Sequence, residues 1–127
     1  MKHQVLILDD EADVRTAIRL QLKDTRFEIL EAENFEQAIS LLGDNAISID
    51  VIICDVRMPG VTGVEAVAYF LREYPTTPVI VLTGFPDIEL AVDFMSKEDV
   101  VEFLTKPVEK DKLIAAVEKA AQGRKLF

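Results

Sequence analysis

The stretch Asp50–Gly60 constrains the fold more than any other part of the sequence. It reads Asp-Val-Ile-Ile-Cys-Asp-Val-Arg-Met-Pro-Gly. The apolar run is too short for a helix and does not alternate with polar residues, which is typical of a strand buried on both faces of a sheet. Pro59 and Gly60 then end any regular element. Asp55 is therefore predicted where a buried strand opens into a loop, either as a reactive carboxylate or as a cap of the turn.

Apolar runs of this kind alternate with helical patterns along the whole chain. Five short strands are predicted at residues 5–8, 27–32, 51–55, 79–82 and 100–104. Apolar residues at the spacing of amphipathic helices predict five helices, at about residues 11–24, 35–42, 63–74, 86–95 and 113–121. Gly43 is expected just beyond the end of the second helix. Five strands alternating with five helices indicate an α/β domain with a parallel sheet covered on both faces.

The predicted topology brings polar residues to one edge of the sheet. Right-handed crossovers favour an open doubly wound sheet, for which we expect the strand order 2-1-3-4-5. Ligands bind such sheets at the carboxyl ends of the strands, where the order reverses between strands 1 and 3. Asp9 and Asp10 follow strand 1, Asp55 ends strand 3, Thr83 follows strand 4 and Lys106 follows strand 5. These five residues are the candidate site.

The candidate site has the composition expected for phosphoryl transfer. Three carboxylates that lie close together repel one another, so a cation is needed to offset their charge. Mg²⁺ suits oxygen ligands and leaves positions for phosphoryl oxygens. With the ammonium of Lys106 and the hydroxyl of Thr83 nearby, Asp55 is a candidate nucleophile. Taken singly, each residue has a simpler interpretation: Asp9 and Asp10 as an acidic first helical turn, Thr83 as a helix cap, Lys106 as a solvated loop residue.

Composition narrows the class of protein. The chain has 127 residues, of which 50% are hydrophobic and 29% are charged, as expected for one globular domain. No apolar run approaches the length of a membrane span, and the N-terminus is a poor signal peptide, so we expect no membrane association and a cytoplasmic location. The net charge of −9 argues against nucleic-acid binding by the domain itself. Cys54 is the only cysteine, which excludes an internal disulfide.

Two absences from the sequence indicate the source of a phosphoryl group. The chain has no Gly-rich phosphate loop of the Gly-x-x-x-x-Gly-Lys kind, which disfavours ATP as the donor. His3 is the only histidine and is expected to be a solvated N-terminal residue.

Four motifs together resemble the receiver domain of bacterial response regulators. They are Leu8–Glu11 (Leu-Asp-Asp-Glu), Asp55–Gly60, Leu82–Gly84 (Leu-Thr-Gly) and Phe103–Pro107 (Phe-Leu-Thr-Lys-Pro). The motifs occur in the family's order and spacing, and the resemblance covers roughly residues 4–121. It implies a flavodoxin-like fold. The order 2-1-3-4-5 is also that of known receivers, so the resemblance and the expected strand order are one prediction rather than two.

The resemblance implies a role for each residue of the metal and phosphorylation site. Asp55 would accept a phosphoryl group from a phosphohistidine on a sensor histidine kinase, which would be another protein because His3 is the only histidine here. Asp10 would bind Mg²⁺ directly, and Asp9 would act mainly through a metal-bound water. Asp55 and the backbone carbonyl of Arg57 would complete the protein ligands.

The resemblance also implies a switch. Lys106 would pair with Asp55 at rest and with a phosphoryl oxygen afterwards. Thr83 would move to hydrogen-bond another phosphoryl oxygen, and Phe103 would turn inward into the vacated space. A cis peptide bond before Pro107 would fix the direction of Lys106. The change would bias the surface formed by the fourth helix, the fifth strand and the last helix.

The expected partners are a sensor histidine kinase, a downstream output domain or effector protein, and, after phosphorylation, a second copy of the chain. Residues 1–123 are predicted to form the receiver domain, and residues 124–127 a tail or the start of a linker. Two alternatives remain. An α/β phosphatase or phosphotransferase would use Asp55 on a small substrate, although Arg57 stands where such enzymes commonly have a second acid. A receiver-like binding module would never be phosphorylated.

Overall fold

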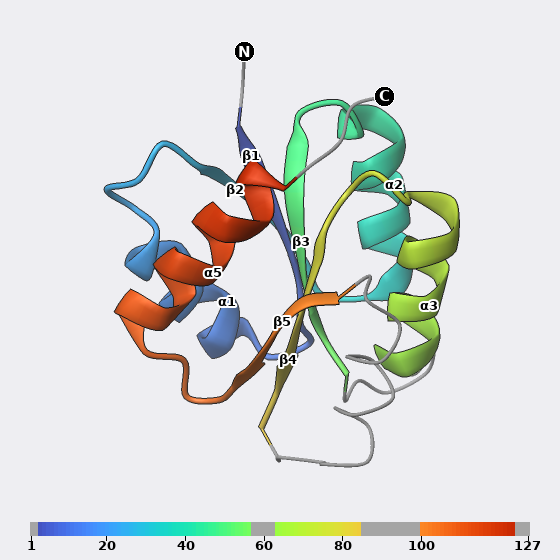
Figure 1. Cartoon of the computed structure of the whole chain (residues 1–127). Helices are drawn as coiled ribbons and strands as arrows, with labels where there is room; N and C mark the ends of the chain where they lie inside the picture. The colour runs from blue at the N-terminus through green and yellow to red at the C-terminus, as the bar shows by residue number, and fades with distance from the viewer. Residues whose placement is uncertain (1–2, 57–62, 85–99, 124–127) are drawn as a thin grey trace.

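The computed structural model describes residues 3–56, 63–84 and 100–123 (Figure 1). Along the chain the elements are β1 (Gln4–Leu8), α1 (Ala12–Gln21), β2 (Glu28–Ala32), α2 (Phe35–Asn45), β3 (Ile49–Asp55), α3 (Gly63–Glu73), β4 (Val79–Thr83), β5 (Val100–Thr105) and α5 (Lys110–Gln122). The helix predicted at residues 86–95, Arg57 and the segment 124–127 lie outside the described residues. Among the described residues, no helix is long and apolar enough to cross a membrane.

The five strands form one parallel sheet in the order β2-β1-β3-β4-β5, which confirms the predicted fold and strand order. Helices α1 and α5 cover one face of this sheet, and α2 and α3 cover the other (Figure 1). Strand β2 is added on one side of β1, and β3, β4 and β5 are added on the other side, so the order of the strands reverses between β1 and β3. This is the switch point at which ligands bind in doubly wound sheets.

The apolar strands form two cores, one on each face of the sheet. All residues of β1 and β4 are buried, and β3 has only one residue that is partly exposed. Successive side chains of a strand point to opposite faces. Leu6 therefore packs in one core with Phe70 of α3, whereas Ile7 packs in the other with Leu113 and Val117 of α5. Burial on both faces explains why these runs lack alternating polar residues.

Three helix boundaries differ from those predicted by more than one residue, and one of them is the start of α5, at Lys110 rather than near residue 113. Helix α1 ends at Gln21 rather than near Asp24, because Leu22 turns inward as a fully buried cap residue and the hydroxyl of Thr25 donates to its carbonyl at 2.6 Å. The prediction that Gly43 lies beyond the end of α2 is wrong. The helix continues to Asn45, whose side-chain amide donates to the carbonyl of Leu41 at 2.9 Å.

Candidate functional site

Backbone pairing at the carboxyl ends of the strands positions the candidate residues. Asp9 directly follows β1, and its N–H donates to the carbonyl of Ala32 at the end of β2 at 3.1 Å. Asp55 is the last residue of β3, and Thr83 is the last of β4. The N–H of Lys106 donates to the Thr83 carbonyl at 2.7 Å. The sheet edge therefore brings together residues that are far apart in the sequence, as predicted.

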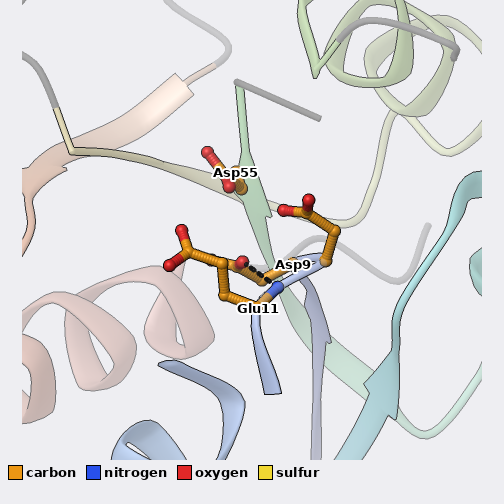
Figure 2. A group of neighbouring side chains, drawn as sticks. Asp9, Glu11 and Asp55 are labelled. Atoms are coloured by element: carbon orange, nitrogen blue, oxygen red, sulfur yellow. Dashed lines mark hydrogen bonds between the residues drawn. The ribbon is translucent and has the colours of Figure 1, made fainter. Parts of the chain in front are cut away.

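Four carboxylates meet at this edge. One oxygen from each of Asp9, Asp10, Glu11 and Asp55 can be chosen so that all lie within 4.8 Å of one another. Asp9 and Asp55 are buried, whereas Asp10 and Glu11 are exposed. Figure 2 shows Asp9 and Glu11, from the segment after β1, beside Asp55 at the end of β3. The N–H of Glu11 donates to Asp9 Oδ1 at 2.9 Å, which fixes the Asp9 carboxylate in the turn.

Lys106 supplies the cation of the site. Its Nζ lies 2.8 Å from Asp9 Oδ2, 3.1 Å from Asp55 Oδ2 and 3.1 Å from Glu11 Oε1. The contact with Asp55 is the one that the resemblance implied at rest. Asp9 Oδ2 is buried and has no hydrogen-bond partner among the described residues. Its contact with Lys106 is therefore described as an ion pair and not as a hydrogen bond. One ammonium therefore contacts three of the four carboxylates, and the cluster keeps an excess of negative charge.

The electrostatics of the site follow from burial. Burial raises the pKa of Asp9 above its ordinary value of 3.8, and the negative charge of Asp55 adds to this shift. The contact with Lys106 and the N–H of Glu11 oppose the shift but do not cancel it. Burial alone would lower the pKa of Lys106, but its contacts with Asp9, Glu11 and Asp55 outweigh burial and raise it. Lys106 is therefore an ammonium in this site at neutral pH.

Arg15 holds the backbone of the acidic turn, a contact that the sequence did not predict. Its Nη1 donates to the carbonyl of Asp9 at 2.6 Å, and its Nε donates to Glu31 of β2 at 3.3 Å. Arg19 pairs with the other oxygen of Glu31 at 2.6 Å. The only hint of this contact in the sequence is that Arg15 lies one helical turn after Glu11. Its partner Glu31 lies in β2, which sequence spacing does not reveal. Arg15 of α1 thus links the backbone of Asp9 to Glu31 of β2.

The other residues implied by the resemblance have the following places. Thr83 is fully buried at the end of β4. Phe103 is partly buried in β5 and packs against the core formed with α2 and α3. The Lys106–Pro107 peptide bond is cis, as the resemblance implied. Arg57 lies outside the described residues, so its carbonyl is still a predicted ligand.

The donor set fits a hard divalent cation. All four groups offer carboxylate oxygens, which are the ligands that Mg²⁺ prefers, and two of the four are exposed to solvent. The excess negative charge favours a second cation beside Lys106. The buried Asp9 Oδ2 has no hydrogen-bond partner among the described residues, so an approaching ion competes there only with the ion pair to Lys106.

Comparison with known proteins agrees with this geometry. Residues 5–118 match the response regulator receiver domain family, in which a phosphoacceptor role and Mg²⁺ binding at an acidic pocket are general. The chemotaxis protein CheY of Listeria monocytogenes is 32% identical over 120 residues, which cover 94% of this chain and 98% of that protein. A receiver domain protein of Clostridium thermocellum has a similar structure, with a TM-score of 0.86 and 32% identity over 94% of both chains.

Other relatives are much longer than this chain. A putative NtrX-like response regulator of Rickettsia typhi is 34% identical over 124 residues, or 96% of this chain, but only 26% of that protein is covered. The chain thus spans about a quarter of the length of the NtrX-like relatives that it matches. The family match, the sheet order and the clustered strand-end residues agree, and the chain belongs to the receiver domains of two-component response regulators.

Proposed function

We propose that Asp55 is the phosphoacceptor of this receiver domain. The supporting observation is its position: Asp55 is buried, ends the central strand β3, and has Lys106 Nζ 3.1 Å from its Oδ2. Asp9 is also buried, but it follows β1 in the acidic turn, where its Oδ1 accepts the N–H of Glu11. Asp10 and Glu11 are exposed and belong to the turn. Asp55 is therefore the carboxylate best placed to be a nucleophile.

The proposed reaction moves a phosphoryl group from a phosphohistidine of a sensor kinase to Asp55. A carboxylate oxygen of Asp55 forms a bond to phosphorus as the P–N bond breaks, and the imidazole leaves with the electron pair of that bond. Lys106 shifts from Asp55 to a phosphoryl oxygen, and the hydroxyl of Thr83 donates a hydrogen bond to a second phosphoryl oxygen. A bound Mg²⁺, held by Asp9, Asp10, Asp55 and the carbonyl of Arg57, would offset the charge that the phosphoryl group adds to this acidic site.

The donor histidine is proposed to come from a separate protein. His3, the only histidine of the chain, precedes β1 and therefore lies at the amino end of the sheet, whereas Asp55 lies at the carboxyl end. Its Nδ1 is 2.7 Å from Asp50 Oδ2, so His3 pairs with the start of β3 rather than being fully solvated. A strand length separates it from Asp55.

The proposed output is a change of the surface at β5 and α5. Phosphorylation would draw Thr83 toward the phosphoryl group and allow Phe103 to turn inward, which biases a two-state arrangement. We propose that this change acts in the cytoplasm on an output domain, an effector protein or a second copy of the chain. The domain would comprise residues 1–123, with residues 124–127 as a tail or the start of a linker.

The test is a phosphorylation assay with a small donor. The protein is incubated with Mg²⁺ and acetyl phosphate at neutral pH, and the intact mass is measured. We expect one added phosphoryl group in the wild type and none in Asp55→Asn, because an amide is a poor nucleophile. Asp13→Asn is the matched control, since Asp13 is an exposed carboxylate in the first turn of α1 outside the cluster. It should be modified like the wild type.

Other results would refute the proposal. A phosphoryl group that persists in Asp55→Asn would place the acceptor elsewhere. Turnover of the donor without a stable adduct would favour a phosphatase. Absence of both adduct and turnover in the wild type would favour a binding module.

A further inference from the structure

Glu11 makes a contact that its place in the helix does not explain. It is the N-cap residue of α1, where a side chain ordinarily accepts an N–H of its own helix, yet its carboxylate makes no cap hydrogen bond. Instead Glu11 Oε1 lies 3.1 Å from Lys106 Nζ, a residue that follows β5. The Glu11 side chain is 62% exposed, whereas that of Lys106 is 14% exposed. Glu11 therefore reaches across the site to a mostly buried ammonium.

This contact bears on a competition between two cations. Lys106 is 2.8 Å from Asp9 and 3.1 Å from Asp55, and both carboxylates belong to the proposed Mg²⁺ site. An ammonium that neutralises these oxygens lowers their attraction for a divalent ion. Glu11 offers the same ammonium a third anion at the exposed rim. The position of Lys106 between these three carboxylates sets how much negative charge remains for the metal.

We propose that Glu11 is a positioning residue: it shares the ammonium of Lys106 and draws it from Asp9 and Asp55 when Mg²⁺ binds, which raises the affinity for Mg²⁺. This inference rests on the proposed function, because it concerns the same site. Removing the charge of Glu11 leaves Lys106 with Asp9 and Asp55 alone, so the ammonium competes more strongly with the ion. The loss of one negative charge near the site acts in the same direction.

The first test compares Mg²⁺ binding by Glu11→Gln and Asp13→Asn, measured by titration calorimetry. Both variants lose one negative charge near the start of α1, but only Glu11 contacts Lys106. We expect Glu11→Gln to bind Mg²⁺ about three- to tenfold more weakly, the size expected for one unit charge near a divalent ion in screened solvent. Asp13→Asn should stay within about twofold of the wild type, because its charge lies outside the cluster. Equal losses in the two variants would overturn the proposal.

The second test shows whether Glu11 acts through Lys106. Glu11→Gln is combined with Lys106→Met in a double-mutant cycle, with Mg²⁺ affinity as the readout and circular dichroism as the check of folding. If Glu11 positions the ammonium, the loss caused by Glu11→Gln should be at least about twofold smaller when Lys106 is absent, because only the direct effect of the Glu11 charge then remains. A loss of the same size in both backgrounds would show that Glu11 acts only through its own charge, which contradicts the inference.

Phosphorylation by acetyl phosphate separates this inference from the proposed function. In Glu11→Gln, the Mg²⁺ concentration at half-maximal rate should rise by a larger factor than the rate at saturating Mg²⁺ falls. If the wild type takes up no phosphoryl group, the proposed function fails, while the calorimetric comparison still decides the role of Glu11. If the wild type is phosphorylated and Glu11→Gln binds Mg²⁺ like the wild type, only the role of Glu11 fails.

Discussion

Replacing Asp9 by asparagine should stabilise the metal-free protein while weakening its response to Mg²⁺. Asp9 is fully buried, and burial raises the pKa of its carboxyl group, so its charge opposes folding. An asparagine of the same shape can still accept the N–H of Glu11, which lies 2.9 Å from Oδ1. Lys106 keeps Asp55 and Glu11, each at 3.1 Å. The amide nitrogen of the new side chain takes the place of Oδ2, which lies 2.8 Å from Lys106 Nζ, so the ammonium must shift toward Asp55 and Glu11. The change therefore removes a buried charge without leaving the ammonium unpaired.

The size of the effect follows from the cost of buried charges. Replacing a whole buried ion pair by neutral groups is often neutral or stabilising by about 1–4 kcal/mol, whereas removing one partner destabilises when the other charge is left unpaired. Because Lys106 keeps two other carboxylates, we expect Asp9→Asn to stabilise the protein at the lower end of this range, by about 1–2 kcal/mol. For a domain of this size that corresponds to a rise in Tm of about 4–8 °C. Mg²⁺ at ten times its Kd should stabilise the wild type by about 1.4 kcal/mol. In Asp9→Asn this gain should be largely lost.

The stability difference should also depend on pH in a defined direction. The folded protein binds the Asp9 proton more tightly than the unfolded chain, because the pKa is raised from 3.8. The wild type therefore loses stability relative to Asp9→Asn as pH rises from about 3.8 through the raised pKa of the folded state, and the difference is constant above it. Below that window both side chains are neutral and the difference should vanish.

Urea denaturation in the presence of EDTA measures these differences, at neutral pH and at several lower pH values. Asp13→Asn is the control, because an exposed carboxylate outside the cluster should change the free energy of unfolding by less than about 0.5 kcal/mol. A variant Asp9→Asn that is less stable than the wild type at neutral pH would refute the argument from burial. So would a difference that does not shrink at low pH.

Two further predictions concern the core and the thiol. Phe70→Ala should lower the free energy of unfolding in urea by about 3–5 kcal/mol, because Phe70 is fully buried beside the rings of Phe35 and Tyr69; a loss below about 1 kcal/mol would mean that the aromatic cluster repacks. Cys54 should react with an aromatic disulfide reagent at pH 8 only as fast as the protein unfolds, because its thiol is fully buried and burial raises its pKa. Rapid labelling of the folded protein would contradict this, and labelling in urea is the control.

The fold could be predicted from the sequence because each strand is recognisable by itself. The runs ending at Leu8, Asp55 and Thr83 are buried on both faces, so their lack of alternation is a direct signal. Helix ends were predicted less well, since they depend on tertiary contacts. Nothing local at Gly43 shows that α2 continues to Asn45.

The members of the site could be predicted, but their charge balance could not. Asp9, Asp55 and Lys106 each end or follow a strand, and parallel strands end at one edge. Two contacts depend on the directions of side chains from three elements. They are the contact of Lys106 with Glu11 and the hydrogen bond that Arg15 donates to the Asp9 carbonyl. Sequence spacing carries no information on such contacts when the partners are 95 residues apart, as Glu11 and Lys106 are.

Asp9 and Glu11 carry the same charge beside Lys106, but Asp9 is buried and Glu11 is exposed, so we expect their effects on stability to differ. Asp9→Asn and Glu11→Gln each remove one carboxylate beside Lys106, and both should weaken Mg²⁺ binding. Their effects on stability should differ, because an exposed ion pair such as that of Glu11 contributes only about 0–1 kcal/mol, whereas the buried charge of Asp9 opposes folding. If net charge alone governed the site, the two variants would change stability in the same direction. We expect Asp9→Asn to be more stable than the wild type and Glu11→Gln to be unchanged or slightly less stable. This result would show that the buried charge of Asp9 lowers the stability of the domain in order to form the cation site. It would also show that Glu11 contributes to the same site from the solvent side with little effect on stability.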